Sequence, residues 1–293
     1  MITKETNTMR FTKMHGCGND YVYVNCFEET VTDPSSLAVK LADRHYGIGG
    51  DGLILIEPSD KADAYMHMFN LDGSEGNMCG NGIRCVAKYI SDHGIVPADR
   101  DTVTVDTKSG VKTIELTKEN GKVASATVDM GVARPDSEMP EKITVAGMDL
   151  LFYGIDLGNP HAVYFLEDND VLMSTIEKCG DLLPSLPLEK IGPAFESHPR
   201  FPDKVNSEFI DIVSRQEVNF RVWERGSGET LACGTGASAA AAAGFLAGKL
   251  DSEVLIHLVG GDLRIRYDEE SGHCFMTGPA TEVFSGDVDP DEL

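Results

Sequence analysis

The sequence has little positive charge, a single tryptophan and no long apolar run. Its 293 residues include 25 lysines and arginines against 48 aspartates and glutamates, so the formal net charge is −23. A surface of this sign repels nucleic-acid phosphates and anionic lipids, and neither is an expected partner. No apolar stretch approaches the roughly 20 residues that cross a bilayer, and Met1 to Arg10 lack the apolar core of a signal peptide. We therefore expect a cytoplasmic chain that does not enter a membrane.

The seven cysteines lack the CxxC spacing of a structural zinc site. Their odd number and the length of the chain exclude a small disulfide scaffold. Most of them are expected to be small buried apolar side chains: Cys17, Cys26, Cys85, Cys179 and Cys274. The other two, Cys79 and Cys233, stand in a repeated motif.

The length predicts two domains, because 293 residues exceed what one compact core usually needs. Alternating apolar residues predict a hairpin over 9–25 and further short strands, and a helix is expected over 82–93. The second half repeats this plan, with an alanine-rich helix over 236–247. We predict an α/β fold of the α+β type with similar domains at 1–127 and 128–278, and with the acidic tail 279–293 packing on the first domain.

Two segments align without gaps, about half the chain apart. They are EGNMCGNG, which ends at Gly82, and ETLACGTG, which ends at Gly236. Each has a glutamate four residues before a cysteine, then Cys-Gly-x-Gly, then a helix. A duplicated domain explains the recurrence, with one cysteine in each half.

A cysteine at a helix N-terminus lies near unpaired N–H groups and the positive end of the helix dipole. Both favour the thiolate, so we expect lowered pKa values for Cys79 and Cys233. The neighbouring glycines leave the amides open to a carboxylate. If a pseudo-twofold axis relates the halves, the two thiols face each other across one cleft. That arrangement suits inversion of a tetrahedral carbon by two bases on opposite faces.

Seven segments, taken together and in order, resemble diaminopimelate epimerase along nearly the whole chain. They are KMHGCGND (13–20), RHYGIGGD (44–51), FNLDGSE (69–75), CGNGIRC (79–85), GNPH (158–161), FPDKVN (201–206) and ERG (224–226) followed by ACGTG (232–236). The resemblance implies two pseudo-symmetric domains, each a sheet wrapped round a central helix, with the active site in the cleft between them. It implies an isomerase that interconverts LL- and meso-diaminopimelate for lysine and peptidoglycan synthesis, without pyridoxal phosphate or metal. It also implies a homodimer in the cytoplasm that acts on a small amino acid.

The resemblance assigns roles to residues of this sequence. Cys79 and Cys233 match the two catalytic bases, and His161 and Glu224 match groups beside them, with Glu224 also near the reacting amine. The distal end of the substrate is assigned to Asn70, Asn159, Asn206 and Arg225, and Asn19 matches another binding residue. The amides of Gly80, Asn81, Gly234 and Thr235 match the cradle for the reacting carboxylate. The chain departs from many relatives at Gly52, where they carry a glutamine that contacts substrate.

Four other functions compete with this one. Gly47, Gly49 and Gly52 match the dinucleotide pattern GxGxxG, but that motif needs a strand before it and a helix after it, and the order expected here is the reverse. A hydrolase with a cysteine nucleophile and His161 as base leaves the second Cys-Gly-x-Gly unexplained. A proline or hydroxyproline racemase and a non-enzymatic binding protein on the same scaffold are the remaining alternatives.

Overall fold

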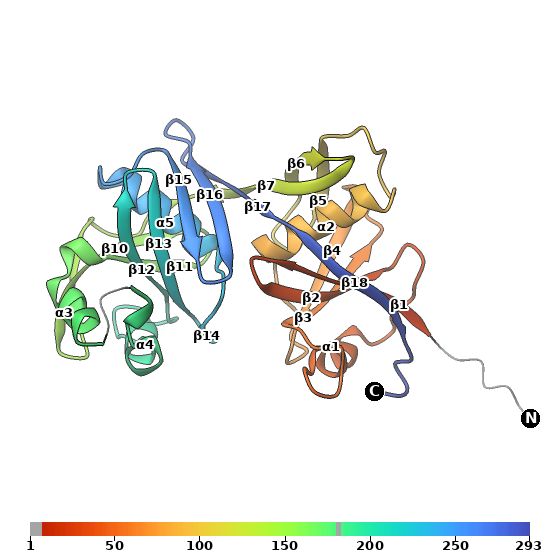
Figure 1. Ribbon diagram of the computed structural model, residues 1–293, viewed down its shortest axis with the longest axis horizontal. Coiled ribbons are helices and arrows are strands. Elements are labelled where there is room, and N and C mark those ends of the chain that lie inside the picture. The colour runs from red at the N-terminus through yellow and green to blue at the C-terminus, as the bar shows by residue number, and fades with distance from the viewer. Residues whose placement is uncertain (1–7, 180–182) are drawn as a thin grey trace, which may run out of the picture. The chain divides into compact units, whose positions relative to one another are not determined.

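The computed structural model describes residues 8–179 and 183–293 (Figure 1). The chain forms two compact units. The first contains the described residues up to Val128 together with Gly278–Leu293, and the second is Asp129–Thr277. Among the described residues, no helix is long and apolar enough to span a membrane.

The sheet of the first unit uses strands from both ends of the chain. In order across the sheet they are β18 (Thr281–Val288), β1 (Met9–Gly16), β2 (Asn19–Asn25), β3 (Gly52–Glu57), β4 (Ala64–Asn70), β5 (Thr102–Asp106), β6 (Lys112–Glu119) and β7 (Lys122–Val132). Figure 1 shows the blue β18 alongside the red β1. Helix α1 (Pro34–Ala42) connects β2 to β3, and α2 (Gly80–Asp92) connects β4 to β5.

The second unit is continuous in sequence. Its strands follow the order β9 (Glu141–Val145), β10 (Met148–Asp156), β11 (Pro160–Phe165), β12 (Asn206–Ser214), β13 (Glu217–Glu224), β15 (Glu253–Leu258), β16 (Gly261–Tyr267) and β17 (His273–Pro279). The short strands β8 (Arg134–Pro135) and β14 (Gly228–Glu229) pair with β10 and β13. Between β11 and β12 lie η1 (Leu166–Asp168), α3 (Asp170–Cys179), η2 (Leu183–Ser185) and α4 (Leu188–Glu196), and α5 (Gly234–Leu246) precedes β15.

The two units share one pattern of strand pairing. Read across either sheet in the orders above, neighbouring strands are antiparallel, antiparallel, parallel, antiparallel, parallel, antiparallel and antiparallel. A parallel pair needs a crossover connection, and in both units the second crossover carries the helix that follows the repeated cysteine motif. The repeat seen in the sequence is therefore a repeat of topology.

Each of these crossover helices is the core of its unit. In α2, Ile83, Val86 and Ile90 are fully buried, and the helix contacts β1, β2, β4, β5 and β6. In α5 the alanines over 237–243 are all buried, and the helix contacts β10, β11, β12, β15 and β16. Helix α5 is apolar on every side, and its alanines let the strands approach closely, whereas α2 also carries polar side chains such as Arg84 and Lys88. The predicted fold class, a sheet wrapped round a central helix in each half, is confirmed.

The predicted elements differ from the structure in a few places. Both central helices begin two residues earlier than expected, at Gly80 and Gly234, because the cysteines themselves are the N-cap residues. Helix α3 was not predicted. Helix α4 is the short helix expected within 180–203, of which residues 180–182 lie outside the described part of the chain. Cys17, Cys85 and Cys274 are buried as predicted, whereas Cys26 is only half-buried.

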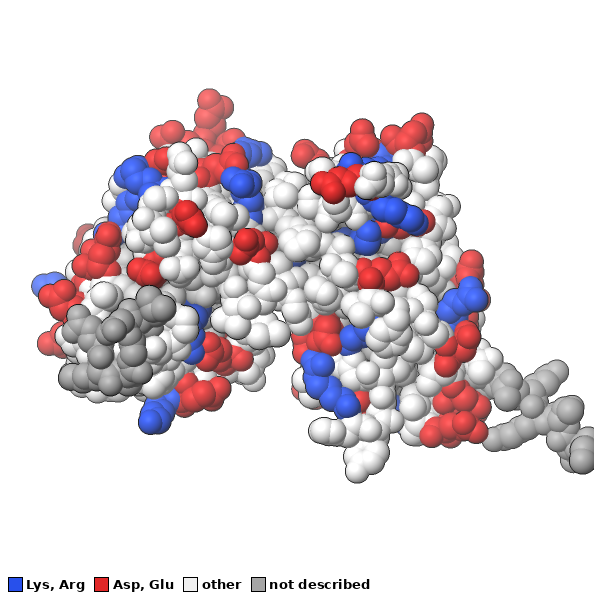
Figure 2. Space-filling model, viewed as in Figure 1, with Lys and Arg blue, Asp and Glu red and all other residues white. Residues whose placement is uncertain are grey.

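The charge excess has no single location on the face shown in Figure 2. Acidic side chains occur on both units there, with basic side chains interspersed among them. Many acidic groups are also paired within their own unit, as Asp63 is with Arg100 and Glu141 with Arg200.

Candidate active site

Each unit places one cysteine at the N-cap of its central helix. Cys79 caps α2 and Cys233 caps α5, both with extended backbone dihedrals. The Sγ of Cys79 accepts a hydrogen bond from the N–H of Gly82 at 3.4 Å, and the Sγ of Cys233 accepts from Gly236 at 3.3 Å. The first N–H groups of each helix have no partner within the helix, so each thiol lies beside a cluster of donors.

In the first unit, Asn19 contacts the Cys79 thiol. Its Oδ1 accepts from Sγ at 3.2 Å, and its Nδ2 donates to Asp51 at 2.7 Å. Arg44 in turn donates to both Asp51 and Asp20. The RHYGIGGD segment therefore holds Asn19 in place, with its first and last residues as the anchors.

Arg84 is a residue of this site that the sequence analysis missed. It is fully buried, and it donates to the carbonyl oxygens of Gly80 and Pro279, both at 3.2 Å, and to Asn81 Oδ1 at 3.0 Å. These hydrogen bonds hold the first turn of α2, which carries the amides of Gly80 and Asn81, in place. No sequence signal marked Arg84, because the burial of this helix face is visible only in the packed structure.

The Cys233 thiol is buried, and its environment differs from the predicted one. Burial raises the pKa of Cys233 well above the usual value of a thiol, and the carboxylates of Glu224 and Glu208 raise it further. The hydrogen bonds from Thr235 and Gly236 act in the opposite direction and are outweighed. The predicted lowering of this pKa by the helix terminus is therefore wrong for Cys233, because desolvation and two nearby carboxylates are the stronger effects.

Glu224 lies at the end of β13. Its carboxylate accepts a hydrogen bond from the hydroxyl of Thr230 and is within hydrogen-bonding reach of the Cys233 thiol. Burial raises the pKa of Glu224. The structure thus brings Glu224 to Cys233, as predicted.

His161 is fully buried on β11, and both ring nitrogens are occupied. Nδ1 lies 2.7 Å from Glu208 Oε1, and Nε2 lies 3.1 Å from Asn159 Oδ1. The Asn159 amide nitrogen lies 3.4 Å from Thr235 Oγ1, which lies 3.5 Å from Cys233 Sγ. His161 therefore reaches Cys233 through Asn159 and Thr235.

Asn206 connects two loops of the second unit. Its Nδ2 donates to the carbonyl of Pro160 at 3.1 Å, and its Oδ1 accepts from the backbone N–H of Arg225 at 2.9 Å. Arg225 is exposed, and its guanidinium donates to the carbonyl of Asp203 at 3.3 Å. Asn206 thus links Pro160 to the backbone of Arg225. The Arg225 guanidinium has further N–H groups that can donate to a carboxylate.

In the first unit, Asn70 ends β4 and donates from Nδ2 to Ser74 at 2.9 Å. It pairs across the sheet with Gly52, the first residue of β3. Gly52 has φ +156°, and a Cβ there would overlap the carbonyl oxygen of Phe69. A glutamine at this position does not fit the local backbone, so the contact it makes in relatives has no counterpart here.

Strand β3 begins at Gly52, the last glycine of the pattern, and α1 precedes Gly47 and Gly49. A dinucleotide fingerprint requires the reverse order, so this alternative is excluded. Within residues 8–179 and 183–293, no three His, Cys, Asp or Glu side chains gather as ligands for a metal ion.

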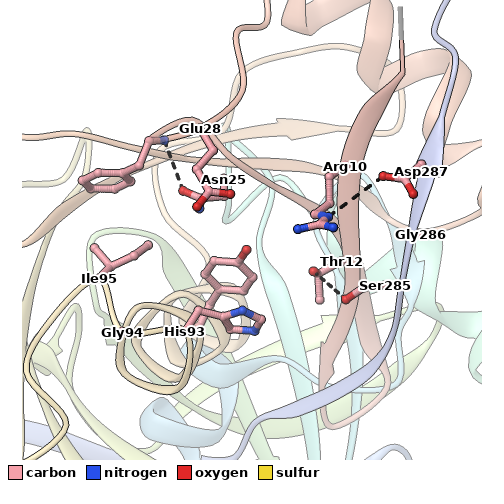
Figure 3. A pocket seen from close by; sticks show the side chains of 12 residues that line it. Arg10, Thr12, Asn25, Glu28, His93, Gly94, Ile95, Ser285, Gly286 and Asp287 are labelled. Carbon is pink, nitrogen blue, oxygen red and sulfur yellow. Dashed lines mark hydrogen bonds and ion pairs between the residues drawn. The ribbon is translucent and has the colours of Figure 1, made fainter. Parts of the chain in front are cut away.

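A pocket of about 460 Å³ in the first unit is lined by none of the predicted site residues (Figure 3). Several of its polar side chains pair with one another or with neighbours. Thr12 and Ser285 share a hydrogen bond of 2.9 Å, and His93 contacts Glu282 at 2.9 Å. This pocket therefore offers no group poised for chemistry.

The fold of this chain is similar to that of several solved structures. Among solved structures, a hydroxyproline epimerase from Agrobacterium vitis aligns with a TM-score of 0.68 at 15% identity, over 97% of this chain and 93% of that one. Methylitaconate-delta-isomerase aligns with a TM-score of 0.66 at 15% identity, over 97% and 96% of the two chains. The fold is that of epimerases and isomerases of this kind.

Sequence comparison is more specific. The family model for diaminopimelate epimerase matches residues 11–135 and 153–283. Proteins named diaminopimelate epimerase from Acetivibrio thermocellus and Methanococcus maripaludis are 48% and 45% identical, over 97% and 96% of this chain and 100% of each relative. The chain belongs to the diaminopimelate epimerase family, and it is an isomerase.

Proposed function

We propose that the chain interconverts LL- and meso-2,6-diaminopimelate by proton transfer between Cys79 and Cys233 at one α-carbon, without pyridoxal phosphate or metal. The observation that supports this most is the matched position of the two thiols. Each caps a helix of 13 residues, accepts from the N–H three residues on, and follows the same strand of the same topology. One base for each face of the substrate is what an inversion requires.

In the proposed reaction, one cysteine as thiolate removes the α-proton and becomes a thiol. The other, as thiol, donates its proton to the opposite face and becomes a thiolate, so protons balance over the turnover. The carbanion next to the carboxylate needs fixed donors in a dry site. The amides of Gly80, Asn81, Gly234 and Thr235 supply them. We propose that domains 1–127, with the tail 279–293, and 128–278 each contribute one of the two thiols and one pair of these amides to the reaction.

Two groups near Cys233 complete the reacting end. Glu224 accepts a hydrogen bond from the substrate α-amine, and His161 orients Asn159 and, through it, Thr235. At the other end, Arg225 forms a forked pair with the distal carboxylate, and Asn70, Asn159 and Asn206 bind the distal amino-acid group. Asn19 binds substrate from beside Cys79.

We further propose that the enzyme works as a cytoplasmic homodimer in lysine and peptidoglycan precursor synthesis, with neither nucleic acid nor membrane as a partner. The acidic surface supports the last point, since it repels both phosphate and anionic lipid.

The test is incubation with LL-diaminopimelate in deuterated water. The α-proton should exchange, and the meso isomer should form at the rate of a catalysed reaction. Parallel incubation with proline and hydroxyproline tests the racemase alternative, and thioester and amide substrates test the hydrolase. The hydrolase is disfavoured, because both nitrogens of His161 are held by Glu208 and Asn159. Tight binding of diaminopimelate without exchange would support a binding protein instead.

A further inference from the structure

A second buried carboxyl group, that of Glu208, lies near Cys233, and no sequence motif pointed to it. Glu208 on β12 and His161 on β11 are both 0% exposed. In the parallel pairing of the two strands, His161 lies opposite Asn206 and Val163 opposite Glu208. His161 and Glu208 are therefore on the same face of the sheet, two residues apart along it.

Glu208 is the buried end of a chain of polar contacts that leads to the thiol. The successive distances are 2.7 Å from Glu208 to His161, 3.1 Å from His161 to Asn159, 3.4 Å from Asn159 to Thr235 and 3.5 Å from Thr235 to Cys233. All five residues belong to the second unit.

The positions of the hydrogens on His161 follow from the orientation of the Asn159 amide, whose nitrogen lies toward Thr235. The Oδ1 of Asn159 can only accept, so Nε2 of His161 carries a hydrogen. A further proton is shared between Nδ1 and Glu208 Oε1, which lie 2.7 Å apart. In the opposite arrangement, Nε2 would accept from the amide of Asn159, whose orientation would be reversed.

Glu208 also packs against the start of α5. A Cβ on Gly236 would lie 2.7 Å from Glu208 Oε1 and 3.2 Å from Cys233 Sγ. The other carboxyl oxygen, Oε2, has no hydrogen-bond partner within the described chain. Burying a carboxyl group with one oxygen unsatisfied is costly, so a residue kept for stability alone would be apolar here.

We propose that Glu208 is a positioning residue for proton transfer at Cys233. Its carboxyl group keeps the hydrogen of His161 on Nε2, which turns the amide nitrogen of Asn159 toward Thr235 and the substrate. This inference rests on the proposed function, since it assigns Glu208 to that same site.

The groups that face Glu208 come from three elements. They are His161 and Tyr164 on β11, Glu224 on β13 and Cys233 at the start of α5. Glu208 is one of the charges that raise the pKa of the Cys233 thiol. Its replacement by a neutral group should therefore lower that pKa while it slows turnover.

The experiment compares Glu208→Gln with Glu208→Asp and with Asp211→Asn. Asp211 lies on the same strand, bonded to Asn219, and serves as the matched carboxylate-to-amide control. An amide at 208 can either donate to or accept from Nδ1, so it no longer fixes the tautomer of His161. We expect Glu208→Gln to keep the wild-type melting temperature, to lose kcat by about tenfold or more, and to raise KM. The pH at which iodoacetamide labels Cys233 should shift downward.

The Asp variant keeps the carboxyl group and should recover part of kcat and the wild-type labelling profile, and Asp211→Asn should behave as wild type. If Glu208→Gln folds and has wild-type kcat, KM and labelling profile, the proposal is overturned. A loss of activity matched by a fall in melting temperature in both variants would also overturn it, in favour of a structural role. If instead the wild type fails to epimerise diaminopimelate, the proposed function fails, and the labelling result still tests Glu208.

The tautomer of His161 can also be measured on the wild-type chain, so this test does not depend on whether a variant at position 208 folds. Nitrogen NMR of protein labelled with ¹⁵N-histidine reports which ring nitrogen of His161 carries hydrogen, with the signal assigned from His161→Gln. Hydrogen on Nε2 supports the proposal, and an Nε2 without hydrogen overturns it.

Discussion

Glu208 Oε1 occupies the space that a side chain at Gly236 would need, because a Cβ at that position would lie 2.7 Å from this oxygen. The same Cβ would lie 3.2 Å from the catalytic candidate Cys233. A glycine in the first turn of α5 is thus required by the packing of a carboxylate and a thiol.

Gly236→Ala should therefore lower activity much more than it lowers the stability of the fold. Alanine favours a helix over glycine by about 1 kcal/mol, which offsets part of the packing cost. The displaced Glu208 and Cys233 should nevertheless lower kcat by about tenfold or more. Steady-state kinetics and thermal melts check this. An alanine variant with unchanged kcat would mean that the thiol position tolerates the shift.

Both thiols should be needed for turnover. Cys79→Ala and Cys233→Ala each remove one of the two proposed bases, and each should lower kcat by at least about a thousandfold, within the range for loss of a general acid or base. Cys26→Ala is the control, since Cys26 is half-buried in the first unit and outside the site. Formation of meso product is the measurement. Substantial epimerisation by either site variant would remove the two-base mechanism.

The ion pair between Asp63 and Arg100 should make stability depend on pH. Two charge-assisted bonds of 2.6 and 2.9 Å, together with two bonds from Thr104, hold the pKa of Asp63 below its usual value despite burial. A lowered folded-state pKa stabilises the fold above the unfolded pKa, and this contribution is lost as pH falls through the folded value.

Asp63→Asn should accordingly cost about 1–2 kcal/mol of unfolding free energy at pH 7. The difference from wild type should shrink as the pH is lowered below about 4, where the carboxylate of the unfolded chain becomes protonated, and should vanish below the lower pKa of folded Asp63. Urea unfolding at pH 7 and at pH 3 measures both values, with the exposed neighbour in Asp60→Asn as control. A difference that stays constant with pH would show that the charge of Asp63 contributes little.

A glutamine at position 52 should not improve the enzyme. The Cβ of any residue there overlaps the carbonyl of Phe69, and φ is +156°. We expect Gly52→Gln to destabilise the fold by about 2 kcal/mol or more and to lower kcat/KM. Gly52→Ala separates the two effects, since it adds the clash without the amide. Higher kcat/KM in the glutamine variant would show that the backbone adjusts.

Arg225 should set the specificity for the distal end of the substrate. Its guanidinium is exposed and has one carbonyl contact in the free chain, so it is available to a carboxylate. Lysine lacks the distal carboxylate and should be a very poor substrate, as should DD-diaminopimelate, whose distal centre is inverted. Arg225→Met should cost about 2–5 kcal/mol in transition-state binding, measured as kcat/KM. Comparable turnover of lysine and diaminopimelate by the wild type would indicate a broad amino-acid racemase.

Much of this arrangement could be predicted from the sequence, because periodic patterns and the repeated Cys-Gly-x-Gly report local structure directly. The central helices and their cysteine caps belong to this part. The places of His161 and Glu224 beside the cysteines were implied only by the resemblance to diaminopimelate epimerase, and the contact of Asn159 with Thr235 was not predicted. Glu208 and Arg84 could not be found in this way. Glu208 bonds to a residue of another strand, and Arg84 donates to the carbonyl of Pro279, 195 positions away, so only the packed structure shows that both are buried. The raised pKa of Cys233 was missed for the same reason, since it depends on burial and on Glu208.

The sheet of the first unit is completed by β18, the last strand of the chain, which pairs with β1. A ribosome therefore finishes the whole second unit before it has made the strand that closes the first. The buried Arg84 likewise obtains one of its acceptors, the carbonyl of Pro279, only after the second unit has been made. Domains usually mature on the ribosome from the N-terminus onward. In this chain the order is inverted, and the nascent first unit remains with an open sheet edge until β18 emerges.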